Sequence, residues 1–384
     1  MEQEFEMNNT CGRSLITFGA GPSKIPPELK KDIINGITEF ENSGISILEV
    51  GHRSQDFIHL MDRCSDRLRR LYNIPENYHI LFLQGGATGQ FDAIPMNLFG
   101  NRGRHRADYL ITGSWSAKAA IEAAKYGEIR EVCPRVPGFG ALPSRETWDF
   151  DPEAAYVYYC DNETIDGLEF SEIPQPPFEV PLVCDMCSNF LSRPVNISRF
   201  GLIFAGSQKN MGCAGLTVVI IRKDLVGGEL PITPRVFNYR LQVASKSVLN
   251  TPPTFTAFVV EIMLRWVEDQ GGLEKMDRLS KAKSQLVYRL IDISNGFYLC
   301  PSHLNNRSRL NVIFRLTDPY LEKIWLSEAK ELGFIGLSGH SSVGGLRISL
   351  YNAISVSDVN RLVSFMRNFM KSNQECILPT VPEK

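Results

Sequence analysis

The feature that most limits the fold of this chain is an alternation of short apolar runs with longer, helix-like segments. The runs are rich in β-branched and aromatic residues, which favour strands. They occupy residues 79–83, 108–111, 156–160, 182–184, 202–205 and 216–221. Because runs that are apolar on both faces and separated by helices form parallel sheets covered on both sides, the pattern predicts a mainly parallel α/β sheet.

A second region follows the local break at Pro252-Pro253. A chain of 384 residues is too long for one small core, so a further domain is expected. Periodicity predicts helices and strands in an order typical of a smaller α/β domain. The helices are expected at 254–269, 273–293, from about 320, and at 356–370, and the strands at 310–314 and 346–350.

Composition and charge exclude several classes of protein. Hydrophobic residues make up 43% and charged residues 22%, as in ordinary globular proteins, and the net charge of -2 indicates no nucleic-acid partner. We interpret the basic cluster at 102–106 as a solvated loop. No run of 18 apolar residues predicts a membrane span, and the acidic N-terminus is unlike a secretory or transit signal, so we expect a cytoplasmic protein.

The nine cysteines are dispersed and odd in number, which favours reduced thiols over a disulfide framework. Cys184 and Cys187 form a C-x-x-C pair. A zinc site would need a second pair, and a redox site would need the pair to open a helix. Neither feature is present, so we expect no metal site.

Small and polar residues follow the apolar runs, where ligands of parallel sheets bind. Lys209 ends one such run, and Asp185 ends the run before it. Asp185 could cap a helix, and Lys209 could lie in solvent, as most lysines do. Adjacent strand ends, however, would bring both into one crevice.

A glycine turn at 85–89 and the flat side chain of Trp115 occupy equivalent positions after other runs. The turn fits neither dinucleotide nor P-loop spacing, and as a motif it indicates a plain tight turn as readily as a phosphate cradle. Carboxylate, lysine, turn and aromatic ring together suit pyridoxal phosphate.

Nine segments, which span residues 19–353, resemble the phosphoserine aminotransferase family of pyridoxal-phosphate-dependent class V aminotransferases. They are GAGP (19–22), EVGHRS (49–54), QGGATGQFDAIPMNL (84–98), TGSWSAKAA (112–120), YCDNETIDGLEF (159–170), DMCSNFLSRPV (185–195), FAGSQKNMG (204–212), NTPPTF (250–255) and GHSSVGGLRISLYNA (339–353). The resemblance implies an α/β chain of fold type I. A large domain over 17–275 would hold a mainly parallel seven-stranded sheet, and a small α/β domain would combine 1–16 with 276–384.

The resemblance also implies roles for individual residues. Lys209 would carry pyridoxal phosphate covalently, Asp185 would keep the ring nitrogen protonated, and Trp115 would stack on the ring. Thr164 would donate to the 3-oxygen. The phosphate would be held by Ala87, Thr88 and Gln208, joined by Asn250 and Thr251 from the second subunit of a homodimer.

The implied substrates are O-phosphoserine, glutamate, 2-oxoglutarate and 3-phosphooxypyruvate. Arg347 would bind the α-carboxylate, and Arg53 with His340 the distal phosphate or carboxylate. Family members commonly have Gly-His-Arg where this chain has Gly339-His340-Ser341. A charge-assisted hydrogen bond is worth ~1.5–3 kcal/mol, so phosphate binding is expected to weaken about 10- to 150-fold.

Two accounts of Ser341 stay open. Either Arg53 and His340 suffice with a further cation such as Lys118 or Arg193, or the chain is a class V aminotransferase of an unphosphorylated amino acid such as serine or alanine. A catalytically inactive homologue that acts as a scaffold is a third alternative, but Lys209 and Asp185 are both present and argue against it.

Overall fold

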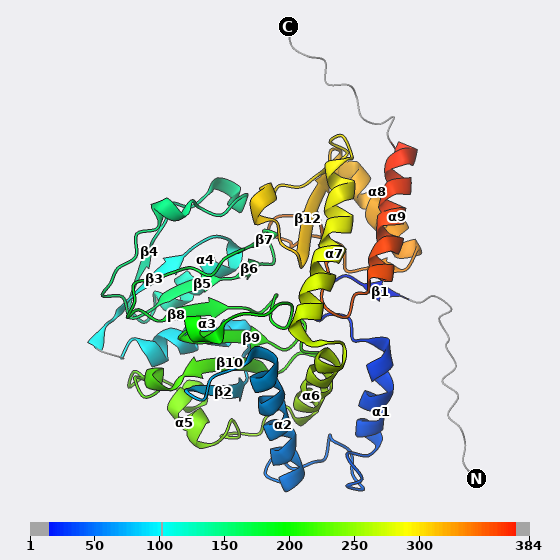
Figure 1. Ribbon diagram of the computed structural model, residues 1–384. Helices are drawn as coiled ribbons and strands as arrows, with labels where there is room; N and C mark the ends of the chain where they lie inside the picture. Colours follow the sequence, from blue (N-terminus) through cyan, green and yellow to red (C-terminus); the bar gives the residue numbers. More distant parts are fainter. Residues whose placement is uncertain (1–14, 101–102, 374–384) are drawn as a thin grey trace, which may run out of the picture.

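The computed structural model describes residues 15–100 and 103–373 (Figure 1). The acidic N-terminus and part of the basic cluster, Arg102, lie outside the described residues. The central element is a seven-stranded sheet in the order β2-β10-β9-β8-β5-β3-β4. Its strands are β2 (Tyr78–Leu83), β3 (Arg106–Leu110), β4 (Glu128–Glu131), β5 (Val157–Cys160), β8 (Leu182–Asp185), β9 (Leu202–Gly206) and β10 (Thr217–Arg222).

The sheet confirms the predicted mainly parallel arrangement. Strand β10 is antiparallel to both β9 and β2, and the remaining neighbours are parallel. The connection from β9 to β10 is too short for a crossover helix, which explains the reversal of that strand. Strand β2 therefore runs in the same direction as β9, and its carboxyl end lies on the same edge of the sheet.

Helices cover both faces of this sheet. One apolar core lies between the sheet, α2 (Gln55–Tyr72) and α6 (Thr254–Asp269), with α1 (Lys30–Thr38) alongside α6. The other core lies between the sheet, α3 (Gly86–Leu98) and α4 (Ser114–Ala123), and includes Tyr239 of α5 (Tyr239–Ala244). Short 3-10 helices lie at Pro27–Leu29, Pro137–Phe139, Arg145–Thr147, Ile197–Arg199, Lys223–Leu225, Arg235–Phe237 and Leu304–Asn306.

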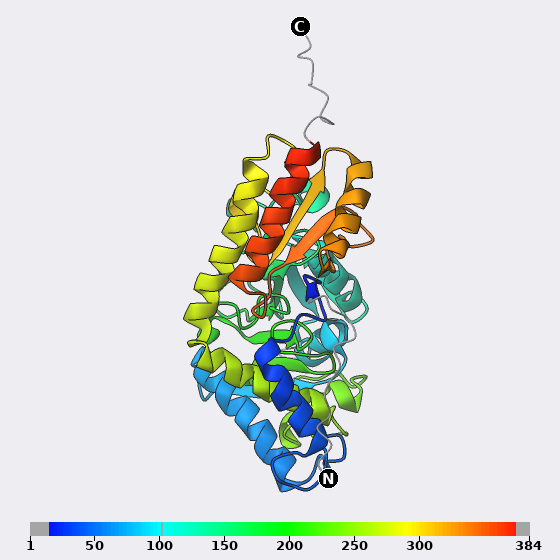
Figure 2. The ribbon, with the colours of Figure 1, turned by 90° about the vertical axis from the view of Figure 1, so that its right-hand side faces the viewer.

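A separate apolar core lies above the large sheet, around the fully buried Trp325. It packs α7 (Gly272–Asp292), α8 (Pro319–Glu331) and α9 (Val356–Asn373) on an antiparallel sheet of β11 (Tyr298–Leu299), β12 (Asn311–Leu316) and β14 (Leu346–Ser349). Figure 2 shows α7 and α9 side by side. Strand β1 (Ile16–Thr17) pairs with β13 (Phe334–Ile335) and joins this part of the chain.

The elements predicted after residue 250 are present, and their ends coincide with the predicted ends or differ from them by at most three residues. The exact division at 275/276 stays a prediction, and helix α7 crosses it. Within the described residues, no helix is long and apolar enough to span a membrane, and no group of three metal-ligating side chains comes together.

Candidate active site

The carboxyl ends of β2, β3, β5, β8 and β9 meet at one edge of the large sheet, and the predicted cofactor residues follow them. Strand β8 ends at Asp185 itself, and Lys209 comes three residues after β9. A two-stranded hairpin, β6 (Asn162–Glu163) and β7 (Leu168–Glu169), follows β5 and carries Thr164 in its turn. Because these strands run in the same direction, their carboxyl ends bring the predicted cofactor residues together at one edge.

Lys209 is buried rather than solvated. The residue is 8% exposed, and its Nζ lies 3.3 Å from the hydroxyl of Thr164. Burial lowers the pKa of the Lys209 amine, but Tyr351, Cys187 and Asp185 raise it, and the net direction is upward. Lys209 therefore lies inside the crevice and not in solvent.

Asp185 faces the same crevice and is 4% exposed. Its Oδ1 accepts a hydrogen bond from the backbone N–H of Cys187 at 2.8 Å, inside a turn and not at the start of a helix. The helix-cap alternative is therefore wrong. Burial raises the pKa of the Asp185 carboxyl, while the Cys187 N–H and the Lys209 charge oppose that rise. A cationic ring nitrogen would supply the missing partner.

Trp115 is the second residue of helix α4. Its indole Nε1 is buried and has no hydrogen-bond acceptor among the described residues. Nζ of Lys118 lies 4.4 Å from the centre of the ring. The indole N–H is therefore an unsatisfied buried donor, and a bound ligand with an acceptor atom would satisfy it.

The glycine turn after β2 forms the start of helix α3. Gly85 and Gly86 have φ values of 99° and 64°, which are left-handed and favour glycine. Ala87 and Thr88 lie in the first turn, where backbone N–H groups have no partner within the helix. Such N–H groups can bind a phosphate, so the geometry favours the phosphate cradle among the two alternatives that the sequence left open.

Gln208 lies close to Lys209, folded back over the end of β9. A Cβ on Gly206 would lie 2.5 Å from its Oε1. Asn250 and Thr251 lie on the other side of the glycine turn, because Asn250 donates to Gln84 at 3.2 Å and Gln84 donates to the carbonyl of Thr251 at 3.1 Å. Both are exposed, and the single chain does not test whether they reach a partner subunit.

The predicted substrate residues lie on two separate parts of the chain. Arg347 is on β14, and its Nε is buried with no acceptor among the described residues. His340 follows β13 and its Nδ1 lies 2.7 Å from the hydroxyl of Ser342. Burial, Lys118 and Arg347 lower the pKa of His340. These interactions indicate that His340, Lys118 and Arg347 surround one space.

Two residues are not joined to that group. Arg53 lies in the exposed turn before α2 and forms no ion pair among the described residues. Arg193 is bound to Asp161 in a nearly buried ion pair, so it is not a free cation for a substrate phosphate. Ser341 is exposed. Of the cations considered as substitutes for an arginine at 341, the geometry favours Lys118.

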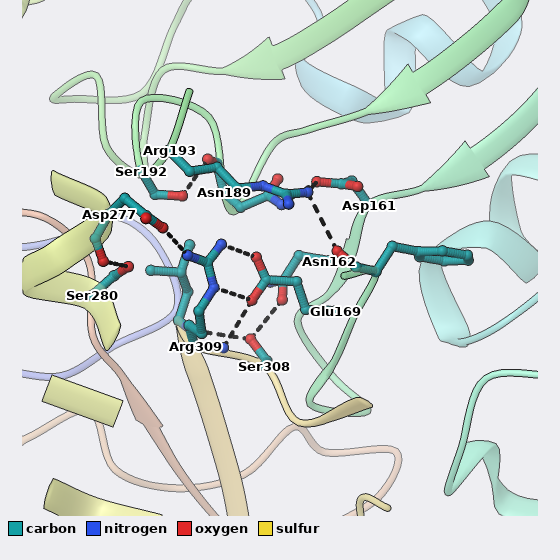
Figure 3. Close-up of polar contacts among 12 residues, drawn as sticks. Asp161, Asn162, Glu169, Asn189, Ser192, Arg193, Asp277, Ser280, Ser308 and Arg309 are labelled. Carbon is teal, nitrogen blue, oxygen red and sulfur yellow. Dashed lines mark hydrogen bonds and ion pairs between the residues drawn. The ribbon is translucent and has the colours of Figure 1, made fainter. Parts of the chain in front are cut away.

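Ion pairs connect the β6–β7 hairpin to the part of the chain that contains the separate apolar core around Trp325 (Figure 3). The carboxylate of Glu169 accepts from Nε and Nη2 of Arg309 at 3.1 and 2.6 Å, and Arg309 also pairs with Asp277 of α7. Arg309 overcomes the effect of burial and lowers the pKa of Glu169. These ion pairs therefore hold the hairpin that carries Thr164 against Arg309 and helix α7.

Sequence reasoning missed Tyr351. Its hydroxyl donates to the carbonyl of Ala20 at 2.8 Å, and Tyr351 is close enough to the Lys209 amine to raise the pKa of that amine. The neighbouring Asn352 donates its N–H to Oδ1 of Asn210 at 2.9 Å. The signal was the polar pair that follows strand β14, the same position that marked Lys209 after β9.

Comparison with known proteins gives one consistent result. The family model described as aminotransferase class-V matches residues 16–362. A phosphoserine aminotransferase from Drosophila melanogaster is 49% identical over 94% of this chain and 100% of its own, and one from Laribacter hongkongensis is 45% identical over 93% and 99%.

Solved structures agree with the sequence comparison. The phosphoserine aminotransferase from Bacillus circulans subsp. alkalophilus has a TM-score of 0.89 at 38% identity, covering 93% of this chain and 98% of that one. The pyridoxal-phosphate-bound phosphoserine aminotransferase from Trichomonas vaginalis has a TM-score of 0.88 at 39% identity, covering 92% and 100%.

Proposed function

This chain belongs to the phosphoserine aminotransferases of the class V family, and we propose that it transfers an amino group reversibly between glutamate and 3-phosphooxypyruvate. The products are 2-oxoglutarate and O-phosphoserine, the reaction belongs to serine biosynthesis, and the cofactor is pyridoxal phosphate. The chain has the α/β architecture of fold type I. The observation that carries the proposal is the buried Nζ of Lys209 beside Thr164, one strand from Asp185.

The residues present fit the cofactor. Trp115 and Arg347 each bury a donor that no described residue satisfies, and the first turn of α3 offers free N–H groups. Asp185 is a buried carboxylate without a full counter-charge. A flat cation with a phosphate at one end would pair with Asp185, stack on Trp115 and accept from the N–H groups of α3, while Arg347 would stay available for the substrate carboxylate.

Each residue has a distinct role toward that group. Lys209 would hold the cofactor through Nζ, and Asp185 would keep its ring nitrogen protonated. Thr164 would donate to the ring oxygen, Trp115 would stack on the ring, and the N–H groups of residues 87 and 88 with Gln208 would hold the phosphate. When bound, pyridoxal phosphate supplies an electron sink for the charge that develops on the substrate Cα.

Lys209 also moves the proton. With its amine free, Lys209 would accept the proton from the substrate Cα at Nζ and hold it for return within the site. Arg347 would hold the α-carboxylate so that the Cα–H bond faces Nζ. Burial of the site excludes water, which strengthens the contact between Asp185 and the ring.

We further propose a cytoplasmic homodimer with its active sites at the subunit interface. Asn250 and Thr251 are exposed beside the phosphate turn, where a partner's cofactor would reach them. The adjacent loop exposes Ile45 and Leu48, and its Ile47 carbonyl accepts from Thr254, so apolar surface lies close to this segment.

A mixture of inactive subunits tests the shared site. Lys209→Ala and Asn250→Ala subunits, unfolded and refolded together, should form mixed dimers with one intact site and more activity than either variant alone. A mixture no more active than its components would contradict a shared site.

A second candidate function is amino transfer from an unphosphorylated amino acid, and Ser341 is the observation that favours it. A half-reaction titration decides between the two. The absorbance of the bound cofactor is followed while O-phosphoserine, serine or glutamate is added. We expect half-conversion at an O-phosphoserine concentration at least about tenfold below that of serine, since one charged contact is worth that much. Equal or reversed preference would support the second candidate.

A further inference from the structure

Glu163 is a buried carboxylate with no part in the roles described above. It is 1% exposed, and both of its oxygens accept backbone hydrogen bonds from helix α4. The N–H of Trp115 donates to Oε2 at 2.8 Å, and the N–H of Ser116 donates to Oε1 at 3.0 Å. Among the described residues, no lysine, arginine or histidine forms an ion pair with it.

Burying the ionised form of this carboxyl group would oppose folding. Burial and the charge of Asp166 raise the pKa of the Glu163 carboxyl to about 8, although the donors of Ser116 and Trp115 act in the other direction. The N-terminus of α4 offsets part of the cost, because unpaired N–H groups and the helix dipole favour an anion there. A neutral cap such as serine would satisfy the helix at lower cost.

Gly113, the residue before α4, is shaped to accept this carboxylate. Its φ and ψ are both -170°, extended values that any residue adopts, so the backbone does not require glycine. The requirement is steric, since a Cβ at position 113 would lie 2.4 Å from both Cγ and Cδ of Glu163. The close approach of the β6–β7 hairpin to helix α4 thus depends on having glycine at position 113 beside Glu163.

The two residues that Glu163 joins both face the cofactor site. Trp115 is held through its own N–H, and Thr164, the next residue in the chain, lies 3.3 Å from Nζ of Lys209. Asp166 binds the same helix turn through the N–H and hydroxyl of Ser114, at 2.7 and 3.1 Å. The hairpin and the helix therefore form one unit.

We propose that Glu163 is a positioning residue that fixes the ring of Trp115 and the hydroxyl of Thr164 relative to each other, and so sets the width of the slot for the cofactor ring. The inference rests on the proposed function, because it assumes that pyridoxal phosphate binds between these residues. It adds a residue that touches neither cofactor nor substrate but determines how well the slot fits.

The variant Glu163→Gln tests the proposal. The amide can accept only one of the two N–H groups and turns its own donor toward the other. Pyridoxal phosphate is titrated into the cofactor-free protein, with tryptophan fluorescence as the signal, and thermal unfolding is measured alongside. We expect the Kd for pyridoxal phosphate to rise about tenfold or more. The absorption maximum of the bound cofactor should shift as well.

Asp318→Asn is the matched control. Asp318 also precedes a helix, α8, and accepts from the N–H of Tyr320 at 2.8 Å. This helix packs on the separate core around Trp325 and not on the large sheet. It undergoes the same carboxylate-to-amide change. We expect its Kd for pyridoxal phosphate to equal that of the wild type.

A second pair of variants keeps the proposal testable if Glu163→Gln folds poorly. Gly113→Ala pushes the carboxylate aside and should weaken cofactor binding in the same way, whereas in a Glu163→Ala background it should cost nothing further. An unchanged Kd and absorption maximum in folded Glu163→Gln or Gly113→Ala, with only the melting temperature lowered, would overturn the positioning role. Failure of the wild type to bind pyridoxal phosphate would instead overturn the proposed function, so the two failures are distinguishable.

Discussion

Replacing Asp185 by asparagine should separate the charge of this side chain from its place in the fold. The residue is buried at the end of β8, and its Oδ1 accepts from the Cys187 N–H. An asparagine fits the same space and its Oδ1 keeps that hydrogen bond. What is lost is the negative charge that faces the cofactor ring, so the variant should fold normally and bind and turn over poorly.

The magnitude follows from the environment of the carboxylate. A hydrogen bond to a charged group is worth ~1.5–3 kcal/mol, so the Kd for pyridoxal phosphate should rise about 10- to 150-fold. Breaking a buried ion pair costs ~3–5 kcal/mol, which predicts a loss of about two to four orders of magnitude in the single-turnover rate with O-phosphoserine. The Kd is measured by titrating pyridoxal phosphate into the cofactor-free protein, and the single-turnover rate by stopped-flow absorbance at saturating cofactor.

Asp108→Asn is a matched control for that experiment. Asp108 is a fully buried carboxylate in the middle of β3, and it pairs with Arg130. Its replacement should lower the melting temperature and leave cofactor affinity unchanged. The reasoning is refuted if Asp185→Asn binds the cofactor and turns over within threefold of the wild type.

Three further predictions concern the same site. Lys209→Ala should abolish transamination, and turnover near the wild-type rate would show that another group carries the cofactor and the proton. Ser341→Arg should raise kcat/KM for O-phosphoserine, since it adds a guanidinium beside His340; no change, or a loss, would mean that Lys118 and its neighbours already complete the pocket. Arg309→Met should lower the free energy of unfolding at pH 7 by about 3 kcal/mol, because it breaks a buried pair. Since Arg309 lowers the folded-state pKa of Glu169, this stabilisation is present above pH ~4.5 and is lost as the pH falls below it; a difference that denaturant titrations find equal at pH 7 and pH 3.5 would contradict the ion pair.

The sequence predicted the sheet because its signal is local. Apolar runs such as residues 202–205 identify strands without reference to distant residues, and the helical segments between the runs indicate parallel pairing. Lys209 and Asp185 were placed together because β8 and β9 are consecutive and parallel. That inference needed no side-chain detail.

Other features depend on contacts between distant residues. Glu163 accepts from N–H groups 47 and 48 residues earlier in the chain, and no periodicity marks such a pair. The steric need for glycine at position 113 comes from the side chain of Glu163, which no local pattern reveals. The sequence of the turn at 85–89 did not show that left-handed glycines open α3 there, and that geometry favours a phosphate cradle.

The central claim is that the amine of Lys209 carries the cofactor. Borohydride reduction of the protein loaded with pyridoxal phosphate, followed by digestion and mass spectrometry, tests it directly. We predict one modified peptide, with the reduced cofactor attached to Lys209 and lost in Lys209→Ala. Labelling of a different lysine, or equal labelling of the variant, would contradict the account.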